Sequence, residues 1–200
     1  MLLSNTAIFE ALDDGRLIIE PQPRPRFKTL IEPKSPYDST AINLTLGEII
    51  SIPKKIDVSI DFRKPQNVPD TLRTLFEEKR LKDGETHALE PGQFILGKTH
   101  EKVTLPMDRH EAWGGKPLLA ARVEGKSTFA RCGLIIHCTA PTIHCGFTGT
   151  ITLEITCFGR YPVLLTPGMA ICQLLVEQVS QDPKDYQSQF QNQVAPAGPQ

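Results

Sequence analysis

The sequence lacks the features that mark nucleic-acid-binding, membrane-spanning and exported proteins. Its 22 basic and 23 acidic residues nearly cancel, so we expect no broad basic surface for nucleic acid. Its longest apolar runs are too short to cross a bilayer. The opening stretch, MLLSNTAIFEALDDGR, has no basic n-region and turns acidic by Glu10, which argues against a signal peptide. These absences favour a globular protein of the cytoplasm.

Cysteine is scarce, odd in number and never arranged as CxxC. Without an export signal, we expect free, reduced thiols that are buried within strand-like runs. The sequence also lacks the HxE…PCxxC signature of zinc deaminases and the GxSxG turn of serine hydrolases. The five cysteines are Cys132, Cys138, Cys145, Cys157 and Cys172.

What remains is the composition of one globular domain with a short tail. Apolar residues make up 40% of the 200 residues and charged residues 22%, which is enough for a sizeable core. We place the domain at residues 1–180. Residues 181–200 are rich in Gln, Pro and Ala and cannot bury much surface alone. We expect a mobile tail that closes over the site, on a ligand or a neighbouring subunit.

The hydrophobic pattern predicts a mainly β protein with a few short helices. Ser4 can cap a helix over residues 5–14, and Gly15 can end it. A second helix is expected over residues 68–82, with Asp70 as its cap. Most other apolar runs alternate or stand between Gly and Pro turns, at the spacing of a sandwich or barrel. Strands are expected in RLIIEP, TAINLTLGEIISI, HALEPGQFILGKTHEKVTLP, PLLAARVEG, CGLIIHCTA, TGTITLEITCFG, YPVLLTPG and MAICQLLVEQV.

Most of the chemistry-bearing side chains lie within residues 123–155. His137, Cys138, His144 and Cys145 are possible zinc ligands, but a strand would send adjacent residues to opposite faces. The same alternation separates Cys145 from His144 as a nucleophile and its base. Singly, each histidine is more often a polar residue at the end of a strand. Neither a metal site nor a covalent mechanism is favoured.

A third interpretation is an anion site beside a carboxylate. Lys126, Ser127 and Thr128 follow a glycine and could cradle phosphate, although a solvated turn is the commoner explanation of such residues. Glu154 falls in mid-strand, on the polar face of TGTITLEITCFG, where a carboxylate is costly unless it is paired. Arg131 is its natural partner. A buried Arg–Glu pair of purely structural importance is the alternative.

These residues complete a resemblance that runs along residues 1–180. GKSTFARCGLIIHCTAPTIHCGFTGTITLEI is similar to the core motif of the dCTP deaminase branch of the trimeric dUTPase superfamily. LSNTAIFEALDDGRLIIEPQP resembles the opening helix and strand of that family, and STAINLTLG resembles its next strand. LEPGQFILGKTHEKVTLP and LTPGMAICQLLVEQV resemble its hairpin and its last strand.

The resemblance implies a β-clip, or distorted jelly-roll, fold that assembles as a homotrimer with active sites between subunits. It implies hydrolytic deamination of dCTP to dUTP and ammonia, in the pathway to dUMP and dTTP. The protein itself would bind no metal, and Mg²⁺ would enter with the triphosphate. No nucleic acid or membrane partner is implied.

Carried over by position, Glu154 is the general base that takes a proton from water. Ser127 and the backbone near Ala140 hold that water, and Arg131 orients Glu154 and keeps it ionised. Residues 152–154 read the base, and Gln173 belongs to the phosphate site. The full set implied by the resemblance is Lys126, Ser127, Thr128, Arg131, Thr139, Ala140, His144, Thr152, Leu153, Glu154, Gln173, Gln189 and Gln193.

Several positions depart from the family pattern and keep other activities open. Lys126 stands in place of Arg and loses the bidentate fork. His144 stands in place of the Asp that contacts the sugar, Asn43 replaces an early Asp, and Gln189 falls where a phosphate-binding Lys is expected. The alternatives are a dUTPase or bifunctional enzyme, an inactive nucleotide-binding homologue, or a modified or monophosphate substrate.

Overall fold

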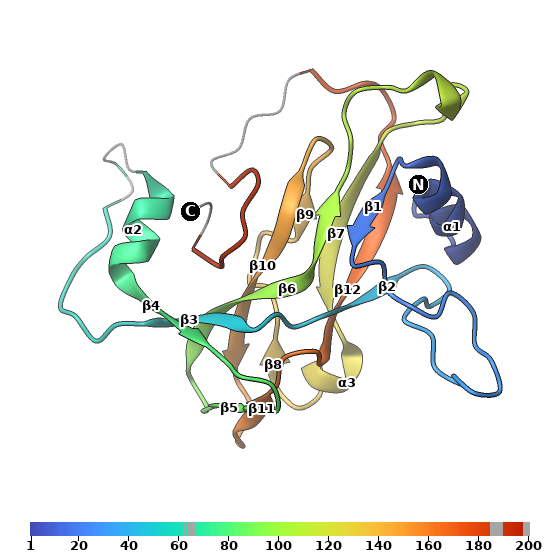
Figure 1. The fold of residues 1–200 in the computed structure, drawn as a ribbon. Helices are drawn as coiled ribbons and strands as arrows, with labels where there is room; N and C mark the ends of the chain where they lie inside the picture. Colours follow the sequence, from blue (N-terminus) through green and yellow to red (C-terminus); the bar gives the residue numbers. More distant parts are fainter. Residues whose placement is uncertain (62, 64–66, 185–189, 198–200) are drawn as a thin grey trace.

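The computed structural model describes residues 1–61, 63, 67–184 and 190–197. Its helices are short and its strands dominate, which confirms the mainly β prediction (Figure 1). In chain order the elements are α1 Asn5–Asp14, β1 Ile18–Glu20, β2 Ile42–Thr45, β3 Ile49–Pro53, α2 Val68–Leu75, β4 Phe76–Arg80, β5 His87–Leu89, β6 Phe94–Thr104, the 3-10 helix η1 Glu111–Trp113, β7 Leu119–Gly125, α3 Ser127–Ala130, β8 Leu134–Ile135, β9 Thr142–Ile143, β10 Thr148–Cys157, β11 Val163–Leu165 and β12 Ala170–Gln178.

Two larger sheets enclose the core. One has the strand order β4-β3-β6-β10-β8, with β1 added beside β6, and the other has the order β2-β12-β7-β9. A small β11-β5 ribbon closes one end. The registered strand pairs are antiparallel. Leu153 and Ile155 from β10, and Leu174 and Val176 from β12, are fully buried and belong to one continuous core.

The first helix forms as the sequence predicts. The Ser4 side chain accepts a hydrogen bond from the backbone N–H of Ala7, and Gly15 ends the helix with φ 81°. That left-handed conformation suits glycine because it has no Cβ to clash. Ile8 and Ala11 bury one face of the helix against the core.

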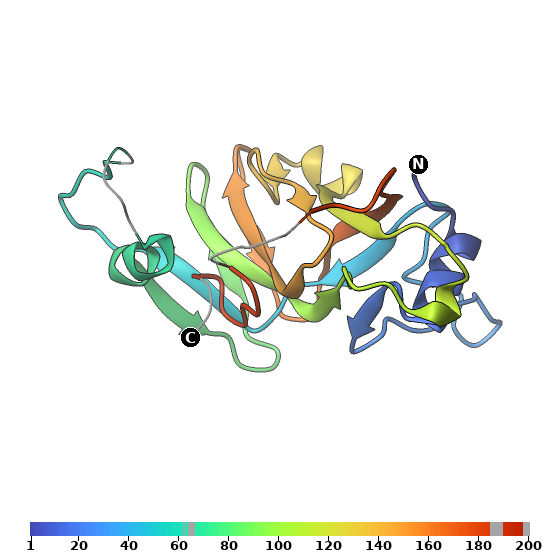
Figure 2. The same cartoon turned by 90° about the horizontal axis from the view of Figure 1, so that it is seen from above.

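The second helix is shorter than predicted. It is capped by Asn67 rather than Asp70, and it ends at Leu75. Residues 76–80 instead form β4, which pairs with β3 along its whole length. Although the sequence of this stretch suits a helix, the backbone hydrogen bonds offered by the open edge of β3 outweigh that local preference. Seen from above, α2 stands at one end of the molecule and α1 at the other (Figure 2).

Helix length also bears on the membrane question. Within the described ranges, no helix is both long enough and apolar enough to cross a membrane.

Candidate active site

A cavity of about 480 Å³ opens beside β10, and Glu154 lies in its wall. The polar residues that line the cavity include Glu154, Thr152 and His144. The rest of the lining is mostly apolar, and one part of it comes from α2, from the first residue of β4 and from the start of β6. The apolar residues of this part are Val68, Leu72, Phe76, Phe94 and Leu96. A mostly apolar pocket with a few convergent polar groups is the usual form of a small-molecule site.

The alternation of β10 brings Glu154 into this cavity. Ile151, Leu153 and Ile155 are at most 2% exposed and face the core, while Thr152 and Glu154 are half-buried on the opposite face. A β-bulge interrupts the pairing with β6 between Thr150 and Thr152. Bulges of this kind re-aim side chains, and they are frequent beside active sites.

Glu154 is held by backbone and not by Arg131. Its Oε2 accepts the N–H of Cys138 at 2.8 Å. Among the described residues no ion pair joins Arg131 to Glu154, so the buried Arg–Glu pair does not form within one chain. The expected strand CGLIIHCTA is also wrong beyond Ile135, because its later residues leave the sheet. That departure turns the Cys138 N–H toward the carboxylate.

The cysteines near the site are poor nucleophiles. Partial burial, and then the charge of Glu154, raise the pKa of the Cys138 thiol. Burial also raises the pKa of Cys145, against the opposing effect of the Gly146 backbone. Both thiols therefore stay protonated near neutral pH. The prediction that all five cysteines are buried is wrong for Cys132 and Cys138, which are exposed.

A C-terminal segment, residues 190–197, pairs with β10 through a bridge between Gly149 and Gln193, and its residues Phe190, Gln193 and Pro196 line the cavity. Gln193 is only 5% exposed. Its side-chain Nε2 donates to the Thr150 carbonyl at 2.6 Å, and its Oε1 accepts from the Thr152 hydroxyl at 3.3 Å. Lys98 adds a 2.7 Å bond to the Val194 carbonyl. The described part of the expected tail is therefore tied to its own chain.

A second group of predicted residues lies on the other large sheet. The ammonium of Lys126 contacts Oδ1 of Asn43. Asp38 Oδ2 accepts hydrogen bonds from Asn43 Nδ2 and from Gln173 Nε2, each at 3.0 Å. Gln173 and Asn43 face each other in the register of β12 and β2. Sequence positions 38, 43, 126 and 173 thus form one polar network.

The predicted residues therefore separate into two half-sites. The cavity half contains Ala140, His144, Thr152, Glu154 and Gln193. The predicted phosphate half contains Lys126 and Gln173. Lys126 is followed directly by the exposed helix α3, which contains Ser127 and Thr128, and Arg131 follows that helix.

Two further predicted residues place no side chain in either half-site, and a third lies outside the described residues. Thr139 is exposed beside the cavity but does not line it. Leu153 is 0% exposed and points into the core, so only its backbone could face a ligand. Gln189 lies outside the described residues.

Sequence reasoning missed the residues that surround the predicted ones. Nothing in the sequence pointed to the Cys138 backbone, since its role depends on a local departure from the sheet. Asn43 was noted as a departure from the family but not as a contact of Lys126. Asp38 had a usable signal, because it sits in the turn just before β2, close to Asn43 in sequence.

The sequence of this chain matches those of known proteins. Residues 2–179 match the family model described as dCTP deaminase-like. The dUMP-forming dCTP deaminase of Dictyoglomus thermophilum is 34% identical over 180 residues, covering 90% of this chain and 81% of its own. The dUMP-forming dCTP deaminase of Coprothermobacter proteolyticus is 35% identical over 201 residues, covering 99% and 95%. The dCTP deaminase of Thermomicrobium roseum is 34% identical over 181 residues, covering 90% and 81%.

The fold agrees with this match. The 2'-deoxycytidine 5'-triphosphate deaminase from Agrobacterium tumefaciens is similar with a TM-score of 0.59 at 18% identity, and the alignment covers 89% of this chain. It spans 48% of that longer protein, so this chain corresponds to about half of it. The chain belongs to the dCTP deaminase-like family, and the family recognised from its motifs is confirmed.

Proposed function

We propose that this protein is a dCTP deaminase, which replaces the C4 amino group of the cytosine ring with oxygen and releases ammonia. The observation that carries the proposal is Glu154, a half-buried carboxylate in the wall of a ligand-sized cavity. Family membership supports it, since relatives over 30% identical are named dCTP deaminases.

Glu154 is the general base in this mechanism. It takes a proton from water, the water oxygen attacks C4, and the proton passes to the departing amino group, so that ammonia leaves and the carboxylate is regenerated. The Cys138 N–H fixes the carboxylate through its 2.8 Å bond to Oε2 and leaves the other oxygen available for water. His144 and Thr152, in the same wall, contact the sugar and the base edge.

The phosphates bind at the second half-site, with Lys126, Ser127 and Thr128 as donors and Gln173 held ready by Asp38. Mg²⁺ arrives as part of the nucleotide. Because Glu154 lies on β10 of one large sheet, whereas Gln173 lies on β12 and Lys126 follows β7 of the other, we propose that a homotrimer with the β-clip arrangement joins the cavity half of one copy to the phosphate half of the next. Arg131 and Ser127 then meet Glu154 across the interface.

A bifunctional enzyme that goes on to release dUMP is the second candidate. Two of the relatives described above are named dUMP-forming. Gln173, hydrogen-bonded at 3.0 Å within the phosphate half-site, matches a glutamine that the resemblance assigns to bifunctional members.

The test is product analysis with pure protein and Mg²⁺, using dCTP and dUTP as separate substrates. Ammonia and dUTP are expected from dCTP, and dUMP with pyrophosphate indicates the bifunctional enzyme. Glu154→Gln should lower kcat by about 10²–10⁴-fold, because a general acid–base group contributes that much. Glu90→Gln, at an exposed carboxylate in a turn, is the matched control. Absence of every product, with Glu154→Gln equal to wild type, would refute the proposal.

A further inference from the structure

A second cavity, of about 610 Å³, lies between residues 23–36 and the sheet that carries Lys126. In Figure 1 these residues belong to the long blue loop between β1 and β2. Three loop cations line the cavity together with Lys126. They are Arg24, Lys28 and Lys34.

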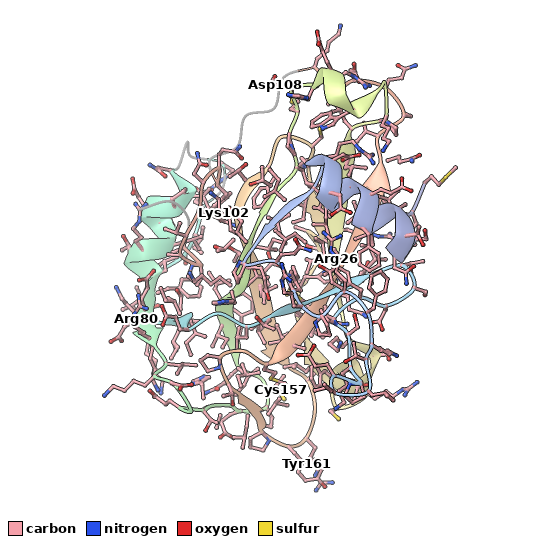
Figure 3. All side chains as sticks on the ribbon, turned by 45° about the vertical axis from the view of Figure 1, so that its right-hand side comes forward. Arg26, Arg80, Lys102, Asp108, Cys157 and Tyr161 are labelled. Atoms are coloured by element: carbon pink, nitrogen blue, oxygen red, sulfur yellow. The ribbon has the colours of Figure 1, made fainter. Side chains whose placement is uncertain are left out.

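Among the residues that the structure describes, none of the three loop cations forms an ion pair with a carboxylate, although all three line the same cavity. Arg26, on the same loop, behaves differently: it pairs with Asp13 at 2.6 Å and lies over the Phe9 ring. Figure 3 shows Arg26 beneath α1. Positive charges left together without a counter-charge attract an anion.

The acidic residues of this cavity are already engaged by protein donors. Glu101 is 4% exposed, and its two oxygens accept from the backbone N–H and the hydroxyl of Thr45, each at 2.9 Å. Asp38 is held by Asn43 and Gln173. Four cations therefore line the cavity against two hydrogen-bonded carboxylates, and the cavity carries a net positive charge.

The loop is also stiffened in a way that suits a binding surface. Pro23, Pro33 and Pro36 line the cavity beside the cations. Proline restricts the unbound backbone, so less conformational entropy is lost when the loop is ordered by a ligand. The Ser35 hydroxyl adds bonds of 2.9 and 3.1 Å to the carbonyls of Pro25 and Arg26.

We propose that Arg24, Lys28 and Lys34 form a subsite for the outer phosphates of a nucleoside triphosphate whose inner phosphate lies at Lys126. The inference rests on the proposed function, because that function places the nucleotide's phosphates at Lys126. The subsite would make the protein bind nucleoside triphosphates more tightly than monophosphates. It adjoins the polar network that contains Asn43 and Gln173.

The subsite is tested by measuring ligand affinity with calorimetry on the full chain. All proteins in this experiment carry Glu154→Gln, so that dCTP is bound but not turned over. The probes are dCTP, dCMP and inorganic tripolyphosphate, each with Mg²⁺. The added pair Lys28→Gln and Lys34→Gln should weaken dCTP and tripolyphosphate binding about tenfold, since each lost charge contact is worth a few-fold in affinity, and should leave dCMP within about twofold. Lys55→Gln with Lys82→Gln removes the same charge from exposed positions elsewhere and should change neither.

Equal dCTP affinity in the two double variants would overturn the subsite, as would an equal loss of dCTP and dCMP. Failure of the parent to bind either polyphosphate would overturn it too. Turnover of dCTP is measured separately on protein with Glu154 intact. If turnover is absent there, the proposed function fails, and the tripolyphosphate comparison still decides the subsite.

Discussion

The position of Glu154 costs folding free energy but leaves its carboxylate open to a ligand in the cavity. A half-buried carboxylate loses hydration, and the single N–H of Cys138 restores only part of it. The neighbouring Leu153 and Ile155 offset this cost by their complete burial in the core. The strand therefore holds the carboxylate rigidly through its neighbours while leaving one face of it open to the cavity.

Asp14 shows the opposite case, a carboxylate whose contacts stabilise the fold. It ends α1 and binds the buried Arg16 at 3.0 Å and Lys116 at 3.0 Å. Burial alone would raise the pKa of Asp14, but the hydrogen bonds from Lys116 and Arg16 outweigh it and lower the pKa below its usual range. The backbone carbonyl of Asp14 also accepts the Trp113 indole N–H at 2.8 Å.

We predict that Asp14→Asn lowers the free energy of unfolding by about 1–3 kcal/mol at pH 7, because Arg16 loses its charged acceptor. A carboxylate with a depressed folded-state pKa stabilises the protein above its unfolded pKa, and this contribution is lost as pH falls through the folded value. Urea titrations between pH 7 and 3 should therefore show the gap between variant and wild type closing below about pH 4. A gap that is constant with pH would contradict this role.

At the scale of elements, the turn between α3 and β8 fixes the position of α3, which follows Lys126. Gly133 has φ 86°, and a Cβ placed there would collide with the backbone of Gly159. The close approach is fixed by a 2.8 Å bond from the Phe158 N–H to the Gly133 carbonyl. The chain segments around Gly133 and Gly159 are therefore in close contact, two residues after Arg131 in the sequence.

Gly133→Ala should cost about 2–4 kcal/mol of stability, from left-handed strain and from a clash with backbone that cannot rotate away. Gly84→Ala is the matched control: its φ is 74°, but a Cβ there would meet open space, so we expect only about 1 kcal/mol. Denaturant unfolding of both variants makes the comparison. Equal losses of stability in the two variants would contradict the prediction, because the backbone at Gly159 would then have moved to accommodate the added Cβ.

At the scale of the whole molecule, Glu154 and Lys126, which the proposed function assigns to one site, line two different cavities of the chain. Residues of α2 and of the C-terminal segment line the Glu154 cavity, whereas the loop after β1 lines the cavity at Lys126. In a rotationally symmetric assembly, the Glu154 cavity of one subunit can meet the Lys126 region of the next, and the same contact repeats at every interface. The expected homotrimer is the assembly that the family resemblance implies.

Mixing two inactive variants tests this arrangement. Glu154→Gln damages only the cavity half and Arg131→Ala only the phosphate half. Co-expressed at equal levels, they should regain about a quarter of wild-type turnover, since roughly one site in four then receives two intact halves. Glu154→Gln mixed with His144→Ala, which share a half, should regain none. Sedimentation at a monomer mass, or no recovery in the first mixture, would contradict the assembly.

Much of this protein follows from local sequence. The alternation in TGTITLEITCFG determines which side chains of β10 enter the core, and Ser4 and Gly15 determine the ends of α1. The motif around Lys126 and Glu154 determined the family, because those residue types at that spacing are rarely found together by chance. Each of these signals depends on residues close together along the chain.

Only the tertiary structure decided which groups meet. It gave Glu154 the Cys138 N–H instead of Arg131, ended α2 at Leu75, and set the cations of residues 23–36 opposite Lys126. These outcomes depend on pairing between segments separated by many residues, whose free energy is shared among whole sheets. Periodicity reports the face that a residue prefers, but it contains no information on the partner that the fold will bring to that face.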